Sequence, residues 1–175
     1  MNVSVFGGSS PKPGDIPYMQ AYRLGKVLAE RGHIVLTGGY IGTMEAVSKG
    51  AAEANGHVIG VTCDEIEDWR PVSPNPYLKE EWRFSTVRQR LAKLIDACDI
   101  ALALPGGIGT LAEVSVMWSN IQTNSISPRP LILLGSGWNK LIGTFYAEFD
   151  SYVPETYRSL VTLAGTVEEA LQKIP

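Results

Sequence analysis

The stretch Leu104-Pro105-Gly106-Gly107-Ile108-Gly109-Thr110-Leu111-Ala112-Glu113 decides the fold of this chain. It closes an apolar run from Ile100 to Leu104, which predicts a buried parallel strand, and it leads into a helical pattern that begins near Thr110. Glycines let a ligand approach the backbone closely, and the free N–H groups at a helix N-terminus favour phosphate. The stretch therefore predicts an anion site where a strand gives way to a helix.

Glu113 is unusual beside such a site. A carboxylate one turn into the helix gains from the helix dipole but repels a phosphate, which suggests chemistry at a neighbouring atom. The alternative is structural: Thr110 would be the N-cap of the helix, and Glu113 would complete a capping box.

Two further glycine turns follow apolar strands. Thr37-Gly38-Gly39-Tyr40-Ile41-Gly42-Thr43-Met44 comes after the strand expected at 34–36, and Gly7-Gly8-Ser9-Ser10 comes after the strand expected at 3–6. Any one of these turns alone is explained as a tight turn that needs glycine backbone angles. Ligands of open α/β sheets bind at the carboxyl ends of the strands, so three such turns together predict one nucleotide-sized pocket.

Strand and helix signals alternate along the chain and predict a doubly wound (Rossmann-like) parallel α/β sheet flanked by helices, in a single domain over residues 1–175. The segment from Asp64 to Lys79 contains three prolines and is expected to be a long loop, either a functional lid or a surface excursion. The expected strands are 3–6, 34–36, 58–61, 100–104, 130–134 and 160–163, and the expected helices are 16–31, 44–55, 86–97, 110–124, 138–149 and 167–174.

The composition excludes several classes of partner. A net charge of −3 offers no basic field for nucleic acid, and no apolar run reaches the length of a membrane span. The chain begins directly with a strand pattern, so a soluble cytoplasmic protein is expected. Cys63 and Cys98 lack the spacing of a metal or redox motif and are expected to be reduced and buried. Glu45 and His57 are interpreted as solvated residues, and neither a metal nor a cofactor is expected.

The two longer turns together resemble the LONELY GUY family of nucleoside monophosphate phosphoribohydrolases, long labelled lysine decarboxylases. The family turn Pro-Gly-Gly-x-Gly-Thr-x-x-Glu is matched in full by Pro105, Gly106, Gly107, Gly109, Thr110 and Glu113. The family turn Gly-Gly-Gly-x-x-Gly-Leu-Met is matched by Gly38, Gly39, Gly42 and Met44, with Thr37 for the first glycine and Thr43 for leucine. Leu91 and Ala112 also replace a usual lysine and a frequent glutamate, which indicates a side branch.

The resemblance implies that Arg90, on the helix before the second motif, works with Glu113. Cleavage of an N-glycosidic bond passes through an oxocarbenium-like cation, which a carboxylate can stabilise while it orients the attacking water. The planar guanidinium of Arg90 could hold that carboxylate or neutralise a phosphate or leaving base. Without the family pattern, Arg90 would be interpreted as a surface arginine. Arg88, two residues away, does not share its face.

The remaining predicted contacts surround the substrate. The backbone N–H groups from Gly107 to Thr110 and the Thr110 hydroxyl are expected to hold its phosphate, with hydroxyls from Ser9 and Ser10. Met44 is interpreted equally as a wall for sugar or base and as a core residue. The predicted substrate-binding residues are Ser9, Gly38, Gly39, Gly42, Thr43, Met44, Gly106, Gly107, Ile108, Gly109 and Thr110.

Two functions fit this pattern. The first is hydrolysis of a nucleoside 5′-monophosphate, of the cytokinin riboside monophosphate or AMP type, to free base and ribose 5-phosphate. The alternative is a non-catalytic nucleotide- or molybdenum-cofactor-binding carrier of the same superfamily, but the presence of both Arg90 and Glu113 favours the enzyme. Lysine decarboxylation is disfavoured because no lysine has a Schiff-base context. A dehydrogenase is disfavoured because the first turn is not Gly-x-Gly-x-x-Gly.

The helix after the second motif also predicts an assembly. Its apolar residues spread around more of the helix than one core-facing stripe requires, and members of the resembled family form two-fold dimers. A homodimer that buries Met117 or Trp118 is therefore expected. The alternative is that the C-terminal helix of the same chain covers them. These apolar residues are Leu111, Val114, Val116, Met117, Trp118 and Ile121.

Overall fold

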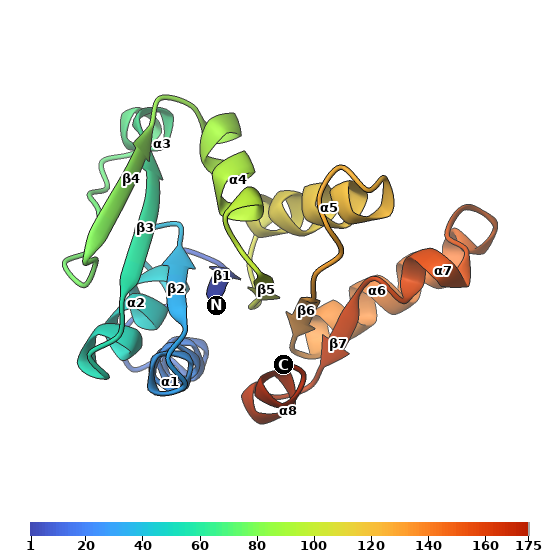
Figure 1. The fold of residues 1–175 in the computed structure, drawn as a ribbon, viewed down its shortest axis with the longest axis horizontal. Helices are drawn as coiled ribbons and strands as arrows, with labels where there is room; N and C mark the ends of the chain where they lie inside the picture. The colour runs from blue at the N-terminus through green and yellow to red at the C-terminus, as the bar shows by residue number, and fades with distance from the viewer. Residues whose placement is uncertain (175) are drawn as a thin grey trace.

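The computed structural model describes residues 1–174, which form one seven-stranded sheet with helices on both faces (Figure 1). The strand order is β4-β3-β2-β1-β5-β6-β7, and every pairing is parallel, which confirms the doubly wound α/β class. The strands are β1 (Asn2–Phe6), β2 (Ile34–Thr37), β3 (Val58–Cys63), β4 (Glu80–Phe84), β5 (Ile100–Ala103), β6 (Leu131–Leu134) and β7 (Thr162–Ala164).

Two apolar clusters hold the helices against the sheet. One joins α1, α2 and α8 to one face, and the other joins α4, α5 and α6 to the opposite face (Figure 1). Because both faces are covered, the central strands carry long apolar runs rather than an alternating pattern. The helices are α1 (Ile16–Glu30), α2 (Thr43–Glu53), α3 (Asp64–Trp69), α4 (Val87–Asp96), α5 (Ile108–Gln122), α6 (Ser136–Glu148), α7 (Glu155–Arg158) and α8 (Val167–Gln172), with a 3-10 turn, η1 (Asp150–Tyr152).

The order of the strands positions the site. The chain builds outward from β1 through β2 and β3 to β4, and then returns to place β5 on the other side of β1. The connections that follow β1 and β5 therefore diverge at the carboxyl edge of the sheet, which is the point where doubly wound folds bind their ligands. The three glycine turns follow β1, β2 and β5, so they open at this same edge.

The structure corrects the sequence prediction most clearly after β3. Asp64–Trp69 is a helix, although a loop was expected, and its first turn carries acidic side chains that the helix dipole favours. Glu80–Phe84 is a parallel edge strand that the sequence analysis did not predict. Its charged residues hide the strand signal, but charge is typical of edge strands because it discourages pairing with another chain.

The start of α5 also differs from the prediction. The helix begins at Ile108 with Gly107 as its N-cap, so Thr110 is its third residue. The capping-box interpretation of Thr110 and Glu113 is therefore wrong. Cys63 and Cys98 are free and buried, as predicted. Within residues 1–174, no helix has both the length and the apolar character needed to cross a membrane.

Candidate active site

The three glycine turns are bonded to one another. Gly8 N–H donates to the carbonyl of Pro105 over 3.3 Å, and the carbonyl of Gly8 accepts from both the backbone N–H and the hydroxyl of Thr43, at 2.9 and 3.0 Å. A Cβ on Gly106 would lie 3.0 Å from the nitrogen of Gly8, and a Cβ on Gly42 would lie 2.5 Å from the carbonyl oxygen of Gly8. Side chains at these glycines would therefore push the turns apart.

A cavity of about 300 Å³ opens beside these turns. Five separate segments of the chain line it, and four of them contribute site residues that the sequence predicted. The lining also includes residues that the sequence analysis did not assign: Gly7, Gly8, Tyr40, Ile66, Trp69 and Arg70. The predicted residues in the lining are Ser9, Met44, Arg90, Gly107, Ile108, Gly109, Thr110 and Glu113.

The N-terminus of α5 forms one side of this cavity. The first N–H group that bonds inside the helix is that of Leu111, which donates to the carbonyl of Gly107 over 3.0 Å. The N–H groups of Ile108, Gly109 and Thr110 have no acceptor within the helix, since they precede its first complete turn. Gly107 and Gly109 are exposed, with open space where a Cβ would stand. This backbone is accessible to an anion and attracts one through the helix dipole.

Arg90 lies in the interior, so its interpretation as a surface arginine is wrong. Its side chain is buried, with Nε donating to the carbonyl of Val61 at 2.7 Å and Nη2 donating to the carbonyl of Gly38 at 3.1 Å. The guanidinium also lies 5.8 Å from the centre of the Tyr40 ring. Arg88, on the same helix, is exposed, as expected from its position. Arg90 is thus held rigidly by backbone acceptors.

Arg90 and Glu113 face each other in the cavity. Nη1 of Arg90 lies 3.7 Å from Oε1 of Glu113, and both side chains are largely buried. Burial raises the pKa of Glu113 to about 7, although the nearby positive charge of Arg90 opposes the shift. The carboxyl group of Glu113 is therefore able to exchange a proton near neutral pH, which is the range that suits general acid–base chemistry.

The turn after β2 is a scaffold behind the cavity. Gly38, Gly39, Gly42 and Thr43 are buried and are not among the residues that line the cavity, so their direct contact with a substrate stays a prediction. A Cβ on Gly38 would lie 1.9 Å from Nη2 of Arg90, so this glycine makes room for the guanidinium. Met44 is buried yet contributes to the lining.

Asn75 holds this turn from outside. Its backbone N–H donates to the carbonyl of Gly39 at 2.8 Å, and its side-chain amide donates to the carbonyls of Gly39 and Tyr40 at 3.0 and 3.1 Å. The hydroxyl of Tyr40 in turn donates to the carbonyl of Cys63. The segment that was expected to be a lid or surface excursion thus supports the site, and it also supplies Ile66, Trp69 and Arg70 to the cavity.

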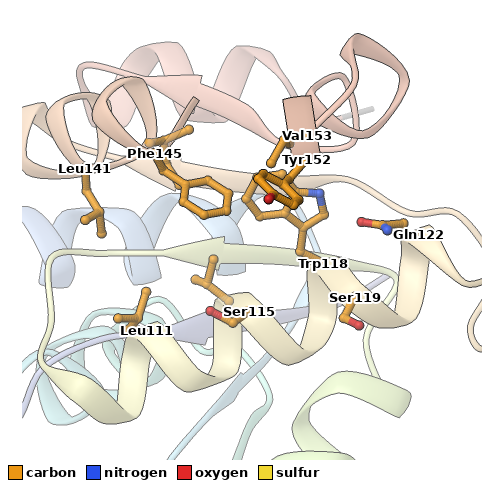
Figure 2. Close-up of a pocket in the computed structure, with 11 residues that line it drawn as sticks. Leu111, Ser115, Trp118, Ser119, Gln122, Leu141, Phe145, Tyr152 and Val153 are labelled. Atoms are coloured by element: carbon orange, nitrogen blue, oxygen red, sulfur yellow. The ribbon is translucent and has the colours of Figure 1, made fainter. Parts of the chain in front are cut away.

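The apolar residues of α5 are distributed between the core and a groove. Met117 is fully buried within the chain, so a partner subunit does not contact it. Trp118 donates its indole N–H to the carbonyl of Tyr157 at 2.9 Å and packs edge-on against Phe145. The segments between β6 and β7, α6 and α7, therefore cover Trp118, rather than the C-terminal helix. Beside it lies an apolar groove of about 530 Å³, with Leu141 and Phe145 across from α5 (Figure 2).

Two other residues have structural partners. Glu45 accepts a hydrogen bond from the Tyr18 hydroxyl at 2.9 Å, and His57 lies 3.1 Å from a carboxylate oxygen of Glu80. Among residues 1–174, no three His, Cys, Asp or Glu side chains gather as ligands of a metal ion would.

The fold and site define a class: a doubly wound α/β protein with an open phosphate-type turn and a buried arginine–glutamate pair. The family model described as "Possible lysine decarboxylase" matches residues 44–174. Two plant proteins are similar over 98% of this chain: "Probable cytokinin riboside 5′-monophosphate phosphoribohydrolase LOGL5" of Oryza sativa subsp. japonica, 31% identical and covered over 70%, and "Cytokinin riboside 5′-monophosphate phosphoribohydrolase LOG5" of Arabidopsis thaliana, 30% identical and covered over 76%. The chain belongs to the LONELY GUY (LOG) family.

Solved structures share the fold. The molybdenum cofactor binding protein from Rippkaea orientalis matches with a TM-score of 0.77 and 25% identity, over 99% of this chain and 94% of that one. A protein named for cofactor binding thus has the same fold as this chain.

Proposed function

We propose that this protein is a nucleoside 5′-monophosphate phosphoribohydrolase, which acts on a substrate of the cytokinin riboside monophosphate or AMP type. The observation that carries the proposal is the buried pair of Arg90 and Glu113, 3.7 Å apart, in a cavity that also contains the open N-terminus of α5. The names of the two plant relatives support the same reaction.

The geometry supports two separate roles along α5, phosphate binding at its N-terminus and chemistry at the sugar one turn later. The free N–H groups from Ile108 to Thr110 hold the 5′-phosphate. Glu113 is three residues further along, about 4.5 Å up the helix axis, so its carboxylate stands beside the sugar rather than the phosphate. Arg90 orients this carboxylate and balances its charge.

The reaction replaces one bond at the anomeric carbon. The bond from C1′ to the base nitrogen breaks, and its electron pair leaves with the base. The carboxylate of Glu113 stabilises the positive charge that develops on the ribose and orients a water molecule. The water oxygen bonds to C1′ while Glu113 accepts the proton, which it can return to the departing base. The products are the free base and ribose 5-phosphate.

A panel of nucleoside monophosphates tests this proposal directly. Each is incubated with the protein, and free base is measured by chromatography. Release of base from at least one nucleotide, together with much slower release from the matching nucleoside, is expected because binding of the phosphate orients the reacting sugar. Equal specificity constants for AMP and adenosine would contradict the role assigned to the phosphate.

A carrier of molybdenum cofactor is the second candidate, and the Rippkaea orientalis structure favours it. A carrier would keep the phosphate-binding turn but would not hydrolyse its ligand. If no nucleotide in the panel releases base, the carrier becomes the better account.

We also propose that the protein is a homodimer. Support comes from apolar side chains that remain exposed near α5 and α6, among them Leu141 at 46%, Phe149 at 48% and Tyr152 at 80%. Light scattering at micromolar concentration separates the alternatives. A mass near the 19.0 kDa of one chain would refute the dimer, whereas twice that mass would support it.

A further inference from the structure

We propose that Arg70 is the residue whose charge pairs with the phosphate group of the ligand. The nature of the phosphate ester rests on the proposed function, but the binding role does not, because a phosphate-bearing cofactor would need the same partner. Arg70 immediately follows α3, where its N–H donates to the carbonyl of Ile66. Its side chain lines the same cavity as the α5 N–H groups.

Two contacts fix the guanidinium of Arg70. Nη1 donates to the hydroxyl oxygen of Ser9 at 3.1 Å, and the guanidinium carbon lies 5.4 Å from the centre of the Trp69 ring. A hydroxyl that accepts from Arg70 keeps its own proton available for another acceptor. Ser9 and Arg70 therefore present donors in the part of the cavity that the first glycine turn borders.

One donor of Arg70 is buried without a partner. Across the described residues, 1–174, Nε of Arg70 is buried and has no hydrogen-bond acceptor. A buried donor on a charged group is costly to leave unsatisfied, by about 1–3 kcal/mol or more. Nε of Arg90, by contrast, is satisfied by the carbonyl of Val61. Because Nε has almost no exposed surface, an anionic oxygen in the cavity would satisfy it only after the guanidinium turns toward the cavity, and that turn removes the cost.

The charge balance of the cavity points the same way. Its charged lining residues are Arg70, Arg90 and Glu113. Arg90 already faces Glu113 and donates to two backbone carbonyls, so its positive charge is balanced within the protein. A phosphate dianion held by the partial positive charge of α5 therefore has Arg70 as its remaining full counter-charge, and an arginine fork suits phosphate oxygens.

Calorimetric titration of the full chain tests the assignment without relying on turnover. AMP, ribose 5-phosphate and inorganic phosphate are the phosphate-bearing probes, and adenosine is the probe that lacks phosphate. Arg70→Ala is expected to weaken binding of AMP and ribose 5-phosphate by about 10- to 100-fold, the scale of one charge-assisted hydrogen bond. Binding of adenosine should stay unchanged, and Arg70→Lys should restore part of the loss.

Arg88→Ala is the matched control, since it removes an exposed arginine that does not line this cavity. The assignment is overturned if Arg70→Ala leaves AMP binding unchanged, if it weakens AMP and adenosine equally, or if the parent protein binds none of the three phosphate probes. Phosphate binding that depends on Arg70 without release of base would refute the proposed hydrolysis and keep this assignment. If Arg70→Ala releases base at the parent rate and binds AMP with the parent affinity, the assignment of Arg70 is overturned and the proposed hydrolysis is kept.

Discussion

The turn after β2 and the turn after β5 are both rich in glycine, and each leads into a helix, yet they do different work. Gly38, Gly39 and Gly42 are buried and enclosed by protein, with Asn75 bonded to the carbonyl of Gly39. The stretch from Pro105 to Gly109 is exposed, and the N–H groups from Ile108 to Thr110 have no acceptor within the helix, which leaves them available to a ligand. A glycine-rich turn therefore indicates that other atoms pack closely against the backbone. Whether those atoms belong to the protein or to a ligand depends on the rest of the chain.

The difference between the turns explains how the proposed catalytic pair, Arg90 and Glu113, is built. The turn after β2 accommodates and binds Arg90, since Gly38 leaves space for Nη2 and accepts its hydrogen bond. The turn after β5 starts the helix that carries Glu113. The turn after β2 thus positions Arg90, while the turn after β5 supplies the proposed anion site and Glu113.

Among the variants that test the roles of the two turns, replacement of Arg90 should change turnover the most. Arg90→Ala removes the group that orients Glu113 and should lower kcat by about 100-fold or more, the scale of a positioned catalytic group. Arg88→Ala, on the exposed side of α4, should change kcat little. Steady-state rates of base release measure both variants, and the reverse ranking would mean that the wrong arginine had been assigned.

Alanine substitutions in the two turns test their division of labour. In Gly42→Ala, the new Cβ would meet the backbone of Gly8 and Ser9 at a residue with a φ of 76°, so a loss of about 2–3 kcal/mol in stability is expected. Gly109→Ala meets no protein atom within 4 Å and should leave the melting temperature nearly unchanged. Its methyl group should instead weaken binding of AMP.

Thermal melting and AMP titration of both variants provide the measurement. Equal melting temperatures for Gly42→Ala and Gly109→Ala would remove the contrast between a scaffold turn and a binding turn.

A further effect, which appears only at alkaline pH, concerns the stability contributed by Glu113. The pKa of Glu113 is raised to about 7 from an ordinary 4.5, so the folded protein binds this proton more tightly than the unfolded chain does. The stabilisation from that proton is complete below pH 4.5 and is lost as the pH rises through 7. Glu113→Gln cannot ionise and should be more stable than the parent at pH 8, by up to about 3 kcal/mol.

Melting temperatures at pH 5 and pH 8 check this sign. The advantage of Glu113→Gln should amount to several degrees at pH 8 and should shrink at pH 5. The same difference at both values would show that the carboxyl group is not perturbed by burial.

The sequence predicts the architecture well where the signals are local. Apolar strands followed by glycine turns indicate β1, β2 and β5, and the switch between them places the site. It fails at Glu80–Phe84, because an edge strand exposed to water carries charged residues in place of an apolar run. It also fails at Asp64–Trp69, because a six-residue helix is too short to show a helical period.

Whether the sequence could predict a site residue depends on whether that residue belongs to a recognisable motif. The glycine stretch before Glu113 indicated that residue, and the family resemblance indicated Arg90; the structure brings the two side chains within 3.7 Å of each other. Asn75 and Arg70 were missed because their partners, Gly39 and Ser9, are more than thirty residues away, and no periodicity relates them. A tryptophan and an arginine just before Pro71 were the only sequence signal at Arg70.

The most direct test of the central claim is the turnover of Glu113→Gln. The substitution keeps the size and the position of the side chain but removes its charge and its ability to accept a proton. With the AMP-type substrate that the parent hydrolyses best, kcat should fall by about 100-fold or more while the affinity for ribose 5-phosphate is preserved. The kcat of the parent should also decline as the pH falls below about 7, where Glu113 becomes protonated. Turnover by Glu113→Gln at the parent rate would contradict the account.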